Sequence, residues 1–68
     1  MPRNHELVAN DPLNHRLRIT FDPTVETFYL QKKSLFVWEM IDYTFDVDVM
    51  KSWRASHKLV WVSSRWRH

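Results

Sequence analysis

The sequence contains no cysteine and no glycine. Without cysteine it cannot build a disulfide framework or a thiolate metal site, and this composition fits a reducing compartment. It also lacks any run of about 18 apolar residues, so no segment is expected to span a membrane. The first residues, Met1 to His5, lead into charged residues and not into an apolar stretch, so no signal peptide is expected. These absences predict a cytoplasmic protein.

Length is the next limit, because the chain has only 68 residues. A domain of this size buries roughly 60% of its unfolded surface, and such a core rarely supplies more than about 3–5 kcal/mol. One domain with marginal stability is therefore expected. Help from a homodimer is an alternative source of stability.

The first 14 residues are rich in turn formers and helix breakers, namely Pro2, Asn4, Asn10, Asp11, Pro12 and Asn14. This composition predicts an irregular N-terminal arm over residues 1–14 and a single α+β domain over residues 15–68. His15–Asp22 then alternates apolar and polar residues, which is typical of a half-buried strand. Pro23 ends that strand, because proline has no N–H to give to a sheet.

Residues Phe28–Phe45 hold six of the ten aromatic side chains and predict a β-hairpin. The expected strands are Thr27–Lys33 and Val37–Phe45, with the turn within Lys32–Phe36. Two-residue hairpin turns usually need glycine, so a longer loop built on a type I turn is expected. Apolar residues on both strand faces favour a position in the middle of a sheet. One face would then lie on a helix and the other would be partly wet or held for a partner.

After the hairpin, Asp46 is placed to cap a helix over Val47–Ser56, and Asp48 adds negative charge at its N-terminal end. Val49, Met50 and Trp53 form the stripe expected to cover the sheet. Lys58–Ser63 returns as a strand. The predicted fold is α+β, a small antiparallel sheet in the order β-β-β-α-β with one short helix packed on a face. The expected core is Leu17, Ile19, Phe21, Phe28, Leu30, Ile41, Phe45, Val49, Trp53, Leu59 and Trp61.

Residues 28–55 carry a resemblance. The run Tyr29-Leu30-Gln31-Lys32-Lys33, a second strand with a tryptophan and then an Asp-capped helix resemble small, mostly uncharacterised proteins of phages and their bacterial hosts. The ββαβ order is also similar to that of the small inhibitor of host RNA polymerase made by T7-like phages. The resemblance transfers no functional residue. It implies that a binding or inhibitory role is commoner than catalysis at this size, and a phage-type inhibitor that occludes the surface of a host enzyme is one form of that role.

No residue set forms a recognisable catalytic, cofactor or metal site. The four histidines are scattered without ligand spacing, and the serines lack a nucleophile elbow. Glu39 and Asp42 are expected on opposite faces of one strand, which disfavours a general acid–base pair. The sequence therefore predicts a protein that is not an enzyme and that uses no cofactor.

Charge is separated along the chain. Residues 39–48 contain four acids and no base, whereas residues 51–68 contain five bases and no acid. Two hypotheses follow, because acidic faces bind proteins with basic surfaces, and bases with free aromatics bind single-stranded nucleic acid. For a protein partner, host or cognate, the predicted binding residues are Trp38, Glu39, Asp42, Asp46 and Asp48. For nucleic acid, the alternative, they are Arg54, Lys58, Arg65, Trp66 and Arg67, with Trp66 as the free aromatic.

Overall fold

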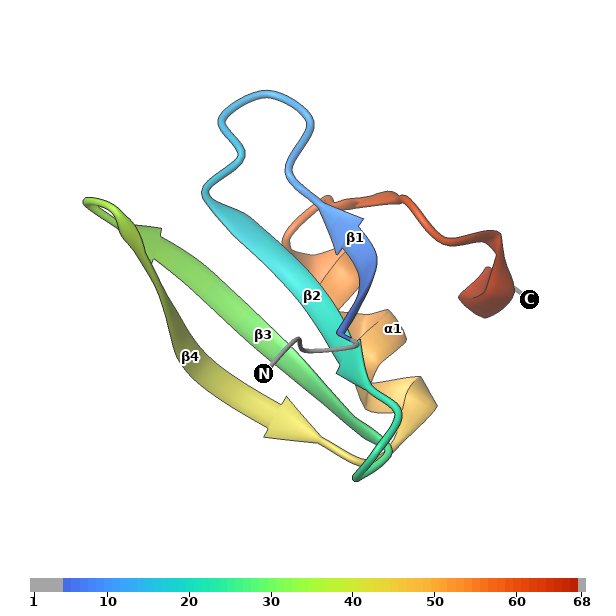
Figure 1. Ribbon diagram of the computed structural model, residues 1–68. Helices are drawn as coiled ribbons and strands as arrows, with labels where there is room; N and C mark the ends of the chain where they lie inside the picture. Colours follow the sequence, from blue (N-terminus) through green and yellow to red (C-terminus); the bar gives the residue numbers. More distant parts are fainter. Residues whose placement is uncertain (1–4, 68) are drawn as a thin grey trace.

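A computed structural model describes residues 5–67 and shows an antiparallel sheet with a helix against one face (Figure 1). The strands are β1 (Glu6–Asn10), β2 (Leu17–Asp22), β3 (Thr27–Ser34), β4 (Val37–Thr44) and β5 (Val60–Trp61). The α-helix is α1 (Val47–Ser56), and a short 3₁₀ helix, η1 (Ser64–Trp66), follows β5. The strand order is β4-β3-β2-β1-β5, so β4 and β5 are the edges. The predicted α+β class, a small sheet with one short helix, is confirmed.

The core lies between the sheet and α1. Paired residues of β2 and β3, Ile19 with Leu30 and Phe21 with Phe28, point to the same face and are buried. This face is called the helix side, and the opposite face, which carries Arg18, Thr20, Tyr29 and Gln31, is called the open face. The remaining buried apolar residues are Val8, Ala9, Met50 and Leu59.

Strand β1 corrects the prediction of an irregular arm over residues 1–14. Glu6–Asn10 pairs with β2 on one side and with β5 on the other, and Val8 and Ala9 are fully buried. Residues 1–4 lie outside the described part of the chain. The turn formers act only after residue 10, where the Asp11 carboxylate accepts hydrogen bonds from the N–H groups of Leu13 and Asn14. The folded domain therefore begins before residue 15.

The β3–β4 hairpin is confirmed, but its loop is shorter than expected. Ser34 pairs with Val37, which leaves Leu35 and Phe36 as a two-residue turn. Leu35 has φ 55°, in the left-handed region that glycine usually fills. A side chain in that region costs about 1–2 kcal/mol, which the pairing of two eight-residue strands offsets.

Helix α1 has the predicted bounds and the predicted cap. The Asp46 carboxylate accepts a hydrogen bond from the Asp48 N–H at 2.8 Å. Met50 is buried and Trp53 packs against the core, but Val49 is 39% exposed, so its placement in the covering stripe was wrong. The strand predicted over Lys58–Ser63 is reduced to the two residues of β5.

Two further residues of the predicted core are exposed. Ile41 is 50% and Phe45 is 69% exposed. The reason is that β4 is an edge strand, whereas the apolar pattern was taken as the sign of a central one. Only β3 of the hairpin lies inside the sheet. Within residues 5–67, no helix has the length and apolar character needed to cross a membrane.

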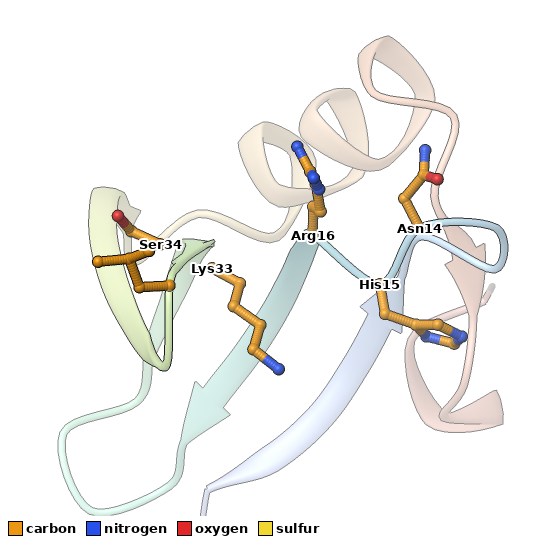
Figure 2. A pocket seen from close by; sticks show the side chains of 6 residues that line it. Asn14, His15, Arg16, Lys33 and Ser34 are labelled. Carbon is orange, nitrogen blue, oxygen red and sulfur yellow. The ribbon is translucent and has the colours of Figure 1, made fainter.

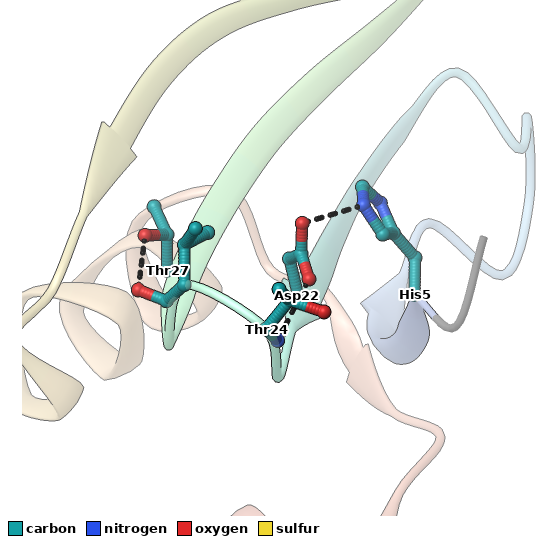
Figure 3. Close-up of polar contacts among 5 residues, drawn as sticks. His5, Asp22, Thr24 and Thr27 are labelled. Carbon is teal, nitrogen blue, oxygen red and sulfur yellow. Dashed lines mark hydrogen bonds and ion pairs between the residues drawn. The ribbon is translucent and has the colours of Figure 1, made fainter.

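Asp22, at the end of β2, is expected to make the free energy of unfolding depend on pH in the acidic range. Its carboxylate accepts a hydrogen bond from the Thr24 N–H at 2.9 Å and lies 3.2 Å from His5 Nε2 (Figure 3). The Thr24 N–H, with a smaller contribution from His5, lowers the pKa of Asp22 below its ordinary value of 3.8. Because the folded-state pKa is the lower one, this stabilisation is complete above about pH 5 and is lost as the pH falls through the folded-state value.

Asp22→Asn should therefore weaken the fall in unfolding free energy between about pH 5 and pH 2. Urea titrations of the parent and the variant at several pH values would measure it. An unchanged acid dependence in the variant would show that Asp22 contributes none of it.

Candidate protein-binding surface

Strand β4 is hydrogen-bonded to β3 on one side only, and its other edge is open. An open edge presents main-chain N–H and C=O groups that can pair with another chain. The strand and the residue that follows it also carry an unusual share of exposed apolar side chains. These are Val37 (59% exposed), Met40 (54%), Ile41 (50%), Tyr43 (55%) and Phe45 (69%).

A β-bulge at Ile41 brings two predicted binding residues to the same face. Glu39 lies opposite Lys32 and Asp42 lies opposite Leu30, so both carboxylates are on the helix side of β4. The prediction of opposite faces was wrong because simple alternation ignores the extra residue of a bulge. Both side chains are exposed. The bulge thus concentrates negative charge along one rim of the strand.

Asp46 and Asp48 extend this acidic rim beyond the end of β4. Both are exposed, and they belong to the cap and the first turn of α1. The Asp46 carboxylate is bonded to the Asp48 N–H, so Asp46 is fixed in place by the helix that it caps. We call Glu39, Asp42, Asp46 and Asp48 the acidic rim.

Trp38 is on the open face, away from the acidic rim. It lies opposite Lys33, and the Arg18 guanidinium stacks 3.9 Å from its ring centroid. Arg18 also donates a hydrogen bond from Nε to Gln31 Oε1 at 2.7 Å. Partial burial lowers the pKa of Arg18 from its ordinary value. The structure therefore groups Trp38 with cations, and not with the four acids with which it was predicted to act.

The open face has an apolar hollow that sequence reasoning missed. It has a volume of about 330 Å³ and is lined by Val25, Thr27, Tyr29, Met40, Tyr43 and Phe45. The Tyr43 and Phe45 rings meet edge to face, 6.0 Å apart. The sequence feature that could have indicated this hollow was the presence of apolar residues on both faces of the hairpin strands.

Two cations of the basic C-terminal segment, Arg54 and Arg65, make contacts within the fold. Arg54 donates a hydrogen bond to the Leu59 carbonyl and lies over the Trp61 ring. Arg65 is paired with Glu6 at 3.2 Å and lies over the Trp66 ring. Lys58 and Arg67 are exposed. The cations predicted to bind nucleic acid thus do not form one open patch with a free aromatic.

Trp66 is the clearest correction in this segment. It packs against the core, with ring centroids 4.9 Å from both Phe21 and Phe28. The short helix η1 turns the chain so that this ring reaches the sheet. Sequence reasoning took it as free because it lies at the end of a basic, turn-rich segment.

Trp66→Ala is accordingly expected to lower the free energy of unfolding by about 2–4 kcal/mol, since it removes a large ring from the core. Arg67→Ala, one residue away, is the control and should change stability by less than about 0.5 kcal/mol. Urea unfolding followed by circular dichroism would measure both. Equal stabilities would mean that the ring is not part of the core.

A second hollow, of about 480 Å³, lies between the β1–β2 connection and the β3–β4 turn. Its lining includes His15, Arg16 and Lys33, so it is a natural place to look for an anion site. Figure 2 shows the Arg16 and Lys33 side chains pointing in opposite directions. Their charges do not converge on one ligand position. No cluster of three or more potential metal ligands occurs in residues 5–67.

Comparisons with protein-family models, with curated proteins and with solved structures found no match to this chain.

Proposed function

We propose that this chain is a small protein-binding module without enzymatic activity, and that β4 and its acidic rim form its contact surface. One observation carries the proposal. An eight-residue edge strand combines an unpaired main chain, exposed apolar side chains and two carboxylates, Glu39 and Asp42, on one side. Stable monomers usually protect such edges, whereas partner-binding surfaces expose them.

The size of the chain supports binding by surface occlusion. A standard interface buries about 800 Å² on each partner, which is about a sixth of the 5023 Å² surface of this protein. Bound through β4, the chain would cover part of a partner and leave its own core untouched. The sequence resemblance favours one specific version of this proposal. In that version the chain is a phage-type inhibitor that acts in the cytosol and covers part of a host enzyme.

Affinity capture from cell lysate, followed by titration of each purified candidate, tests the proposal. We expect a protein ligand that binds with micromolar or tighter affinity and that loses binding when β4 is altered. Retention of single-stranded DNA at physiological salt, with no protein ligand, would contradict it. Nucleic-acid binding is the less supported function because Trp66 packs against the core and Arg65 is paired with Glu6.

Self-association through β4 is a further expectation, because an open edge can pair with a second copy. The pairing should be weak, since it brings Glu39 and Asp42 of one copy near those of the other. We therefore expect a monomer–dimer equilibrium that shifts toward dimer when salt screens the carboxylates. Light scattering over a concentration series at low and high salt would measure it. A constant monomer mass up to about millimolar concentration in both salts would rule out the dimer.

A further inference from the structure

The two sides of β4 differ in chemistry. On the open face, Met40 and Tyr43 border the apolar hollow. On the helix side, the strand carries Glu39 and Asp42, the two residues of the acidic rim that belong to β4, and both are exposed. An extended chain added to this edge would turn alternate side chains to these two sides.

We propose that β4 binds an extended peptide segment in which apolar and basic residues alternate. This inference rests on the proposed protein-binding function and specifies its ligand. The segment would pair its main chain with the open edge, as peptides do in strand addition. Its apolar side chains would meet Met40 and Tyr43 at the hollow, and its Lys or Arg side chains would meet Glu39 and Asp42.

Charge complementarity selects this occupant over others. Lys32 is the cation opposite Glu39 on β3, whereas Asp42 lies opposite an apolar residue and Asp46 and Asp48 follow it. The rim is therefore net negative and attracts a basic strand. An acidic peptide would be repelled, and a second copy of this chain, whose β4 carries the same carboxylates, would bind more weakly than a basic peptide.

The register also limits where the pairing occurs. The Asp42 carboxylate accepts a hydrogen bond from the Tyr43 N–H at 2.8 Å, so that main-chain donor is already bonded. The bulge at Ile41 interrupts the regular spacing of the edge. We therefore assign the main-chain pairing to Val37–Met40, with Asp42 and the hollow contacting side chains at the end of the peptide.

The test uses fluorescent synthetic peptides and the full chain. The probe alternates Lys with Val or Leu. The comparison peptides are a permuted one of identical composition without alternation, one with Glu in place of Lys, and one N-methylated at alternate main-chain nitrogens. Fluorescence anisotropy should show that the probe binds at least about tenfold more tightly than any of the three, and that salt weakens it. Amide shifts in an NMR titration should concentrate in Val37–Met40.

Matched variants locate the charge contribution. Glu39→Gln with Asp42→Asn keeps the shape of the rim and should weaken the probe about tenfold or more. Glu26→Gln, an exposed acid in the β2–β3 turn, is the control and should leave the affinity unchanged within about twofold.

Three results would overturn the inference. Equal affinity for the probe and the permuted peptide would mean charge attraction without strand pairing. Unaltered binding by the N-methylated peptide would exclude main-chain pairing. Amide shifts in Val37–Met40 that depend on the protein concentration and do not respond to added peptide would mean that a second copy of the chain, and not a peptide, pairs with β4. In each case the proposed function would still hold if affinity capture finds a protein ligand whose binding is lost when β4 is altered. If no such ligand is found, both the proposed function and this inference would be wrong.

Discussion

Partner binding is expected to be lost when Glu39 and Asp42 are both replaced by lysine. The two carboxylates lie on the same side of β4 and are exposed, so they can be changed without disturbing the core. Reversing both charges places two cations where a basic partner surface would dock, and like charges facing each other cost several kcal/mol. We expect affinity to fall at least about 100-fold, with much of the loss in the association rate at low salt.

The matched control is the double variant Arg65→Ala, Arg67→Ala, which changes the same number of charged residues elsewhere on the surface. Arg65 is mostly exposed in its pair with Glu6, so the control should fold and keep the partner. Circular dichroism would establish folding, and calorimetric titration would give the affinities. The opposite ranking, with micromolar binding of an unstructured oligonucleotide, would favour the nucleic-acid function. Neutralising two phosphate contacts should then flatten the salt dependence by about 0.7 per contact on single strands.

Phe28→Ala is expected to cost about 3–5 kcal/mol, which is close to all the stability that a domain of this size has. Phe28 is 1% exposed and its ring contacts Phe21 and Trp66, with centroids 4.8 and 4.9 Å away. Its removal leaves a cavity at the centre of the core. The variant should be largely unfolded at 25 °C, with a weak or absent cooperative transition in urea.

Phe45→Ala is the informative comparison, since the same substitution is made at a residue that the sequence pattern also placed in the core. Phe45 is 69% exposed, so its loss should cost less than about 1 kcal/mol. It should, however, weaken binding at the hollow that Phe45 lines. A Phe45→Ala protein as unstable as Phe28→Ala would mean that the open face is covered in solution, for example by a second copy.

Some features of this protein follow from short stretches of sequence. The helix Val47–Ser56 and its Asp46 cap were predicted to the residue, because one carboxylate and the next ten residues contain the whole signal. The alternation before Pro23 likewise predicted the strand β2. In both cases the deciding interactions are between residues that are close along the chain.

Other features depended on contacts between distant segments. Val8 and Ala9 are core residues because β1 lies between β2 and the two-residue β5, and the turn formers among residues 1–14 predicted no strand there. Trp66 reaches Phe21 and Phe28 only after the chain has passed through β5 and turned through η1. Tertiary packing overrides local turn preference because a buried apolar side chain contributes more free energy than a turn former costs.

The candidate site likewise has some features that follow from the sequence and others that depend on contacts between distant segments. The sequence by itself determined that acids gather over residues 39–48 and that the hairpin is apolar on both faces. Only the tertiary structure decided that β4 is an edge, that the Ile41 bulge brings Glu39 and Asp42 to one side, and that Trp38 lies with Arg18 on the other. Strand order and bulges are set by the hydrogen bonds that each strand forms with its neighbours, and the alternation of residues along one strand does not contain that information.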